Sequence, residues 1–241
     1  MVRKILVALL VVASMIGSVW GLWGVEATRL HEIRVVGNSR VSEAQIRHLA
    51  GLGIGTPLID INVESAELSV LRHTWISSAQ IRRIFPDTAV IEVTERQIRA
   101  LLMLDKLFLV DINGEPFRVA TPPDLDYPVI TGLEEEFAHQ EPELARRIIH
   151  ESLAWLDALD APRTTIATGS QKLSSQDVSE VHFDEKSGYA LVLRNGGEIR
   201  LGFRDRSILS RLDALLAGGV DLSLPHRIDL GFDQLAVVTP L

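Results

Sequence analysis

An uncharged apolar stretch near the amino terminus precedes regions of alternating and helical hydrophobic patterns. Residues 5–25 contain no charged side chain. As a helix, a stretch of this length spans about 30 Å, the thickness of the hydrocarbon core of a bilayer. Arg3 and Lys4 precede it and Glu26 follows it, so the positive-inside rule places the amino terminus in the cytoplasm. We therefore expect a short cytoplasmic tail (1–4), a single transmembrane helix and an exported body.

A cleaved signal peptide is the alternative to a retained anchor, because it also begins with a short basic region. The apolar stretch is longer than the usual core of a signal peptide. Trp20 and Trp23 crowd the small-residue positions at which cleavage would occur, and tryptophan prefers the membrane interface. These features favour the retained helix.

The pattern that follows predicts one strand, two helices and two further strands. The elements are a strand at 31–38, helices at 43–50 and from Asn62 to about His73, and strands at 75–83 and 88–96. Ser42 and Gln45 have the spacing of a capping box for the first helix. One sheet with two helices on one face can close a small core. We expect an α+β domain over residues 26–96, with Trp75, Ile81 and Val90 in its core.

Beyond Arg96, short strands predominate. The predicted strands lie at 107–111, 180–184, 189–194, 198–202, 227–232 and 235–239, and the predicted helices at 143–159 and 207–216. Asn113-Gly114 and Asn195-Gly196-Gly197 are typical of hairpin turns. We expect residues 97–241 to form a mainly antiparallel β domain with covering helices, so the whole chain belongs to the α+β class.

Composition excludes several classes of protein. The chain is 46% hydrophobic and 23% charged, which is typical of globular proteins. Its 32 acidic and 24 basic residues give a net charge of −8, and an acidic chain repels phosphate backbones, so nucleic-acid binding is not expected. Cysteine is absent, which excludes disulfides, cysteine-ligated metals and thiol nucleophiles.

No motif predicts a catalytic or metal centre. The seven histidines do not pair at metal-ligand spacing, and the HExxH and GxSxG motifs do not occur. The glycine-rich run 51–55 follows a helix and lacks the P-loop lysine, which favours a helix-ending loop. His182 with Asp184, and the acidic run 134–136, are typical of solvated surfaces. We expect no catalytic residue, cofactor, metal or small-molecule substrate.

Five segments share features with one known family. They are IRVVGNSRVSEAQI (33–46), RHTWISSAQIRRIFPDTAVIEVTERQIRA (72–100), LFLVDINGEPF (107–117), VLRNGGEIRLGFRDRSILSRLDALL (192–216) and RIDLGFDQLAVV (227–238). In this order they resemble the FtsQ/DivIB family of cell-division proteins over nearly the whole chain. The first domain is similar to a POTRA domain, a periplasmic module used for protein contacts, and the second to the β-rich domain of that family.

The resemblance implies a non-enzymatic organiser of the divisome, anchored in the inner membrane at the division septum with its body in the periplasm. Its implied partners are FtsB and FtsL, small bitopic coiled-coil proteins, and through them FtsW and FtsI, which synthesise septal peptidoglycan. An exposed edge strand offers unpaired backbone groups to which a partner can add a strand. The candidate partner-binding residues are Phe232, Leu235, Ala236, Val237, Val238 and Thr239. An ordinary core role for these residues is the alternative.

Three features depart from the family pattern. Thr74 stands where the family usually has proline, and Gly231 stands where its final motif usually has arginine. The loss of that arginine removes a possible salt bridge to an acidic partner. The short tail (1–4) weakens the expectation of cytoplasmic contacts.

Two other functions stay open. A membrane-anchored envelope enzyme acting on peptidoglycan would need paired carboxylates in a cleft, for which Asp111 and Asp184 are the candidates. A POTRA-type chaperone for secreted proteins would bind many clients rather than one coiled-coil partner.

Overall fold

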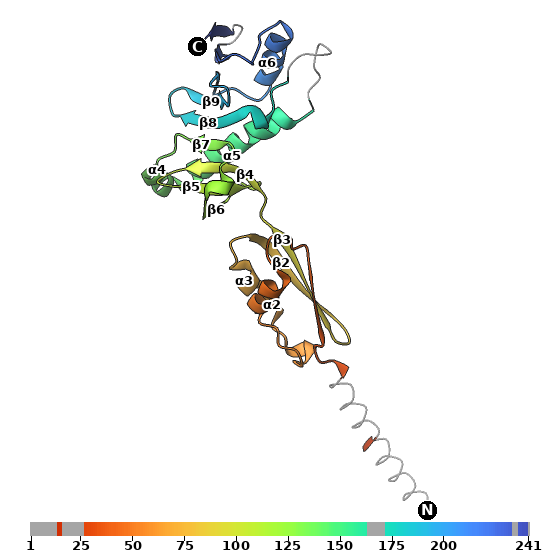
Figure 1. The fold of residues 1–241 in the computed structure, drawn as a ribbon. Helices are drawn as coiled ribbons and strands as arrows, with labels where there is room; N and C mark the ends of the chain where they lie inside the picture. Colours follow the sequence, from red (N-terminus) through yellow and green to blue (C-terminus); the bar gives the residue numbers. More distant parts are fainter. Residues whose placement is uncertain (1–13, 16–26, 163–171, 233–235, 241) are drawn as a thin grey trace, which may run out of the picture. The chain divides into compact units, whose positions relative to one another are not determined.

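The computed structural model describes residues 14–15, 27–162, 172–232 and 236–240. It divides into two compact units, Met1–Arg96 and Gln97–Leu241 (Figure 1). Most of the predicted membrane span lies outside the described residues. Among the residues that are described, no helix is long and apolar enough to cross a membrane.

The first unit has the predicted order of elements. These are β1 (Glu32–Val36), α2 (Glu43–Ala50), the 3-10 helix η1 (Leu58–Asp60), α3 (Val63–Leu71), β2 (Ile76–Ile84) and β3 (Thr88–Glu95). The sheet order is β1-β3-β2, with β1 parallel and β2 antiparallel to β3. Both helices lie against this sheet (Figure 1).

Local sequence signals set the helix boundaries in this unit. The Ser42 hydroxyl accepts the Gln45 N–H, and the Gln45 side chain accepts the Ser42 N–H, which completes the capping box. Asn62 caps α3 by accepting the Ser65 N–H at 3.0 Å. Gly51 ends α2 in the left-handed region (φ 61°), as predicted for the glycine-rich run.

The predicted core of this unit is confirmed. Trp75, Ile81 and Val90 are all buried. The Arg40 guanidinium lies 4.1 Å from the centre of the Trp75 ring. The Glu95 carboxylate accepts three consecutive backbone N–H groups, from residues 39–41, and so holds the loop after β1 against the end of β3.

The second unit is a nine-stranded mixed sheet. Its elements are β4 (Ile98–Met103), β5 (Leu107–Asp111), β6 (Pro116–Val119), η2 (Pro122–Asp124), β7 (Val129–Thr131), α4 (Glu135–Gln140), α5 (Pro142–Asp160), η3 (Ser175–Asp177), β8 (Val178–Asp184), β9 (Gly188–Leu193), β10 (Glu198–Gly202), α6 (Ile208–Ala217), β11 (His226–Asp229) and β12 (Val237–Pro240). The strand order is β12-β11-β10-β9-β8-β7-β4-β5-β6. Most neighbouring pairs are antiparallel, whereas β4–β7, β7–β8 and β10–β11 are parallel.

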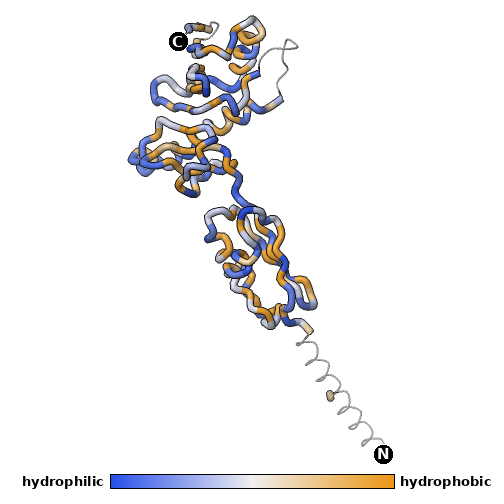
Figure 2. Tube along the Cα trace, viewed as in Figure 1, coloured by the Kyte–Doolittle hydropathy of each residue, from blue (hydrophilic) through white to orange (hydrophobic). Residues whose placement is uncertain are grey.

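One row of side chains crosses the core face of this sheet. Paired residues on successive strands are Leu102, Ile130, Val181, Leu191, Ile199 and Ile228, each at most 2% exposed. They belong to one apolar cluster that also contains Leu156 of α5 and Leu212 of α6. The hydropathy colouring shows apolar residues throughout both units (Figure 2). This row of core side chains runs toward β12, the strand at one edge of the sheet.

Candidate partner-binding edge of the β domain

The terminal strand β12 lies at an edge of the nine-stranded sheet. It pairs antiparallel with β11 on one side, and none of the other described strands pairs with its second side. The strand covers Val237–Pro240 rather than 235–239, and β11 ends at Asp229 rather than at Phe232. Leu235 lies outside the described residues.

The register shows which backbone groups of β12 face away from the sheet. Leu230 donates its N–H to Arg200 O of β10 at 2.9 Å. Because backbone groups alternate sides along a strand, Asp229 then faces β12. Asp229 pairs with Val237, and Ile228 pairs with Val238. Val237 therefore points its N–H and C=O toward β11, and Val238 points its own toward the open edge.

Val238 also extends the row of core side chains, because paired residues on adjacent strands share a face of the sheet. Its partner Ile228 is fully buried, whereas Val238 is 36% exposed. Ala236 lies on the same face and packs against the core cluster. A strand added beside β12 would cover Val238 and continue the row.

The alternative that the candidate residues are ordinary core residues is wrong for four of them. Val237 and Phe232 are 48% and 55% exposed, and Val238 is exposed where the sheet ends. Thr239 is also exposed. Ala236 is the candidate that packs on the core.

A hollow of about 550 Å³ adjoins this edge. Its lining includes two aromatic side chains, Phe203 and Phe232, and two cationic ones, Arg200 and Arg204. Arg204 donates to Gly231 O at 2.9 Å, so a guanidinium from the loop after β10 lies beside the position at which the family usually has arginine. Phe203 and Arg204 were not predicted as site residues from the sequence, although an aromatic residue in the polar run FRDR was the available signal.

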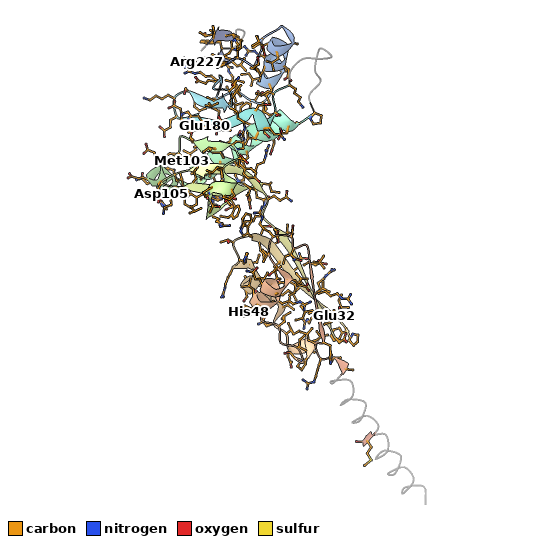
Figure 3. The ribbon with its side chains drawn as sticks, viewed as in Figure 1. Glu32, His48, Met103, Asp105, Glu180 and Arg227 are labelled. Carbon is orange, nitrogen blue, oxygen red and sulfur yellow. The ribbon has the colours of Figure 1, made fainter. Side chains whose placement is uncertain are left out.

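The sheet face opposite the core is polar near this edge. Glu198 accepts hydrogen bonds from Arg200 at 2.7 Å and from Arg227 at 2.8 Å (Arg227 is labelled in Figure 3). Burial raises the pKa of Glu198, but the bonds from both arginines outweigh it and hold the pKa below its usual value. The ion pairs link β10 to β11, the strand that supports β12.

The two carboxylates of the enzyme hypothesis are not brought together. Asp111 accepts the N–H groups of Asn113 and Glu115 in the turn after β5. Asp184 accepts the Ser187 N–H at 2.7 Å in the turn after β8, and hydrogen bonds from Ser187 lower its pKa. Since β5 runs antiparallel to β4, β7 and β8, these two turns lie at opposite ends of the sheet.

The remaining candidate groups have structural surroundings. His182 Nδ1 lies 2.7 Å from the Thr131 hydroxyl, which also bonds Glu180, the residue labelled on β8 in Figure 3. The acidic run 134–136 is exposed at the start of α4. Within the described parts of the chain, no three histidine, aspartate or glutamate side chains gather as a metal site would require.

Comparison with known proteins assigns both units. The family model "POTRA domain, FtsQ-type" matches residues 28–96, and "Cell division protein FtsQ/DivIB, C-terminal" matches residues 100–231. The chain belongs to the FtsQ/DivIB family of cell division proteins. This family consists of non-enzymatic division scaffold proteins, so the chain has a role in the divisome rather than in catalysis.

Individual relatives agree with this assignment. The cell division protein FtsQ of Anaeromyxobacter sp. (strain K) is 36% identical over 207 residues, which cover 80% of this chain and 66% of that protein. FtsQ of Syntrophotalea carbinolica is 30% identical, with 91% of this chain and 86% of the relative covered. FtsQ of Myxococcus fulvus is 32% identical, with 85% and 73% covered.

Proposed function

We propose that this chain is a single-pass inner-membrane protein that binds an FtsB/FtsL-type partner by strand addition to β12. Through that partner it helps to control septal peptidoglycan synthesis by FtsW and FtsI. Its parts are a cytoplasmic tail (1–4), a transmembrane helix (5–25), a periplasmic POTRA domain (26–96) and a periplasmic β domain (97–241). The proposed contact residues are Phe232, Leu235, Ala236, Val237, Val238 and Thr239.

The observation that carries the proposal is the interrupted row at Val238. The row is buried from β4 to β11 and becomes exposed at β12, as it does at the other edge, where Val119 of β6 is 44% exposed. Val238 also directs its backbone N–H and C=O outward, as the register of β11 requires. An extended partner segment would form main-chain hydrogen bonds at Val238 and place an apolar side chain against it.

The hollow beside the edge supplies the second part of the contact. Phe232 and Phe203 offer apolar surface, and Arg204 offers positive charge for an acidic side chain, whereas Arg200 is already paired with Glu198 and Asp229 also lines the hollow. Arg204 thereby stands in for the arginine that Gly231 replaces, because its guanidinium reaches Gly231 O. The partner segment is expected to pair an apolar residue at Val238 with an acidic residue near the hollow.

Val238→Pro is the direct test, because it removes the outward N–H at the centre of the edge. Val119→Pro is the matched control. Val119 lies on β6 at the other edge, and it also points outward, since the next residue, Ala120, donates its N–H to Leu107 O of β5. Affinity of the full-length protein in nanodiscs for an FtsB-type ectodomain is measured by calorimetry. We expect Val238→Pro to weaken binding by about tenfold to hundredfold, because one buried hydrogen bond is lost.

Unchanged affinity in Val238→Pro, with the circular-dichroism spectrum intact, would move the partner site away from β12. Equal losses in Val238→Pro and Val119→Pro would show a general loss of sheet structure rather than a lost contact. Val237→Pro tests what happens when β12 itself detaches from the sheet. The Val237 N–H faces β11, so its loss breaks the pairing of β12 with β11. Hydrogen exchange of β11 is expected to rise in Val237→Pro and to stay unchanged in Val238→Pro.

The proposed topology has its own test. A reporter fused after Leu241 is expected to be active in the periplasm and not in the cytoplasm. The reason is that Arg3 and Lys4 retain the amino terminus in the cytoplasm, so that the carboxyl terminus lies across the membrane. Cytoplasmic activity of this fusion, or a mature chain that begins after Gly21, would contradict the retained anchor.

A further inference from the structure

One end of the POTRA unit carries most of its exposed apolar side chains. Within residues 27–96, seven large apolar residues are exposed: Val36, Ile54, Ile59, Leu68, Leu71, Ile84 and Phe85. Four of them lie in the loop 53–60 or at the tip of the β2–β3 hairpin. Ile59 is 74% exposed and Phe85 is 62% exposed, which is unusual for residues of this size.

Backbone hydrogen bonds join these two segments to the first described residues of the unit. Leu58 donates its N–H to Thr28 O at 2.9 Å, and His31 donates its N–H to Asp87 O at 2.8 Å. Arg83 bridges hairpin and loop by donating to the carbonyl oxygens of residues 58 and 59. The loop 53–60, the hairpin tip and the entering chain therefore form one end of the unit, as Figure 1 shows.

The chain just outside this end is the predicted membrane span. Its last apolar residue, Val25, precedes Thr28 by three residues, which span at most about 10 Å when extended. If Val25 lies at the membrane interface, this end of the unit is within reach of the lipid headgroups. Exposed isoleucine and phenylalanine side chains are the kind that insert at that depth.

We propose that the POTRA domain docks on the periplasmic surface of the inner membrane through Ile54, Ile59, Ile84 and Phe85. This inference rests on the membrane anchor of the proposed function and adds a second, peripheral contact with the same bilayer. The contact restricts how the domain can tilt about the short connection 26–27. It thereby sets the height and orientation at which the POTRA domain is held above the membrane.

The charges at this end indicate apolar rather than electrostatic docking. Arg29 and Arg83 are matched in number by Asp60 and Asp87, and both guanidinium groups already donate to backbone carbonyls. The docking is therefore expected to be independent of the fraction of anionic lipid.

The absence of cysteine allows single-cysteine labelling without a background. The full-length chain carrying Ile59→Cys or Phe85→Cys is labelled with bimane. It is reconstituted into vesicles of phosphatidylethanolamine and phosphatidylglycerol that contain a doxyl-labelled lipid. Leu68→Cys is the matched control, because Leu68 is 57% exposed on α3 away from this end. Met15→Cys reports on the anchor.

We expect lipid quenching at residues 59 and 85 to be several-fold stronger than at residue 68 and to persist without phosphatidylglycerol. Ile59→Ser is expected to reduce the quenching of a label at residue 85, whereas Leu68→Ser is not. Quenching at residue 15 but not at residues 59 and 85 would overturn the docking and leave the anchor intact. A label at residue 15 that is not quenched would overturn both.

Discussion

The nine-stranded sheet has two edges, and they are built differently. The strand β6 begins with Pro116, carries Arg118 and leads into a 3-10 helix with two further prolines. The strand β12 carries two exposed valines and no charge. Prolines and charged residues are the usual protection against unwanted strand pairing. The β6 edge is thus the better protected of the two, although its Val119 is 44% exposed, and the β12 edge is the more open one.

The open edge is also short. Pro240 pairs with His226 at the end of β12, and the alternation of the strand directs its backbone outward, where it has no N–H to donate. The main-chain hydrogen bonds that β12 can form with a partner strand are therefore centred on Val238. Side-chain contacts in the adjoining hollow have to supply much of the remaining affinity.

The largest expected effect concerns one buried residue on each of the two strands that pair with the edge strands. Ile228 supports β12, Leu109 supports β6, and both are fully buried. Ile228→Ala and Leu109→Ala are each expected to lower the free energy of unfolding by about 2–5 kcal/mol, because each leaves a cavity. Only Ile228→Ala should also weaken partner binding. Urea unfolding and calorimetry measure the two quantities, and equal binding by both variants would contradict the comparison.

The next effect concerns the hollow. Phe232→Ala removes exposed apolar surface that the partner would bury and is expected to weaken binding by about 2 kcal/mol. Leu125→Ala is the control, since Leu125 is 52% exposed in the segment after β6. Binding that falls equally in both variants would show that the hollow adds nothing specific.

A smaller effect is expected when the protection of β6 is transferred to β12. Val238→Lys places a charge at the end of the core row and removes an apolar contact, which should weaken binding by about tenfold. Val237→Lys changes the opposite face of the same strand and should weaken binding less than Val238→Lys does. Titration of the partner into both variants tests this difference, and a stronger loss in Val237→Lys would reverse the assignment of the two faces.

The smallest effect concerns the ion pairs that link β10 to β11. Since its two arginine partners hold the pKa of folded Glu198 below 4.5, the charged form contributes stability above that pH. This contribution is lost as the pH falls through the lowered pKa. Glu198→Gln is therefore expected to cause a slight loss of stability at neutral pH. As the pH falls, the stability of this variant should decline less than that of the unchanged protein. Thermal melts between neutral and acidic pH test this, and an unchanged pH profile would show that the pairs contribute nothing.

Local signals in the sequence determined much of the first unit. The spacing of Ser42 and Gln45 located the start of α2, and Asn62 located that of α3, because capping depends on residues only three apart. The places of Trp75, Ile81 and Val90 on adjoining predicted strands put them in the core, and all three are buried. The family motifs along the chain indicated the family that the comparisons establish.

Three strands of the second unit were not predicted from the sequence. In β4, Ala100, Leu101 and Leu102 are all buried, so the alternation that identifies a half-exposed strand is absent. The strand β6 begins with proline, and β7 has only three residues. Such strands are stabilised by neighbours that lie far away in the sequence.

The tertiary structure alone decided the properties of the candidate site. The sequence indicated a terminal strand, but only the pairing of β11 with β10 showed that Val238 rather than Val237 faces the open edge. The tertiary structure also brought Arg204 to Gly231, which is 27 residues away in the sequence, and separated Asp111 from Asp184. Capping and alternation depend on neighbours within one element, whereas an edge exists only once all strands have paired, and so no local pattern can specify it.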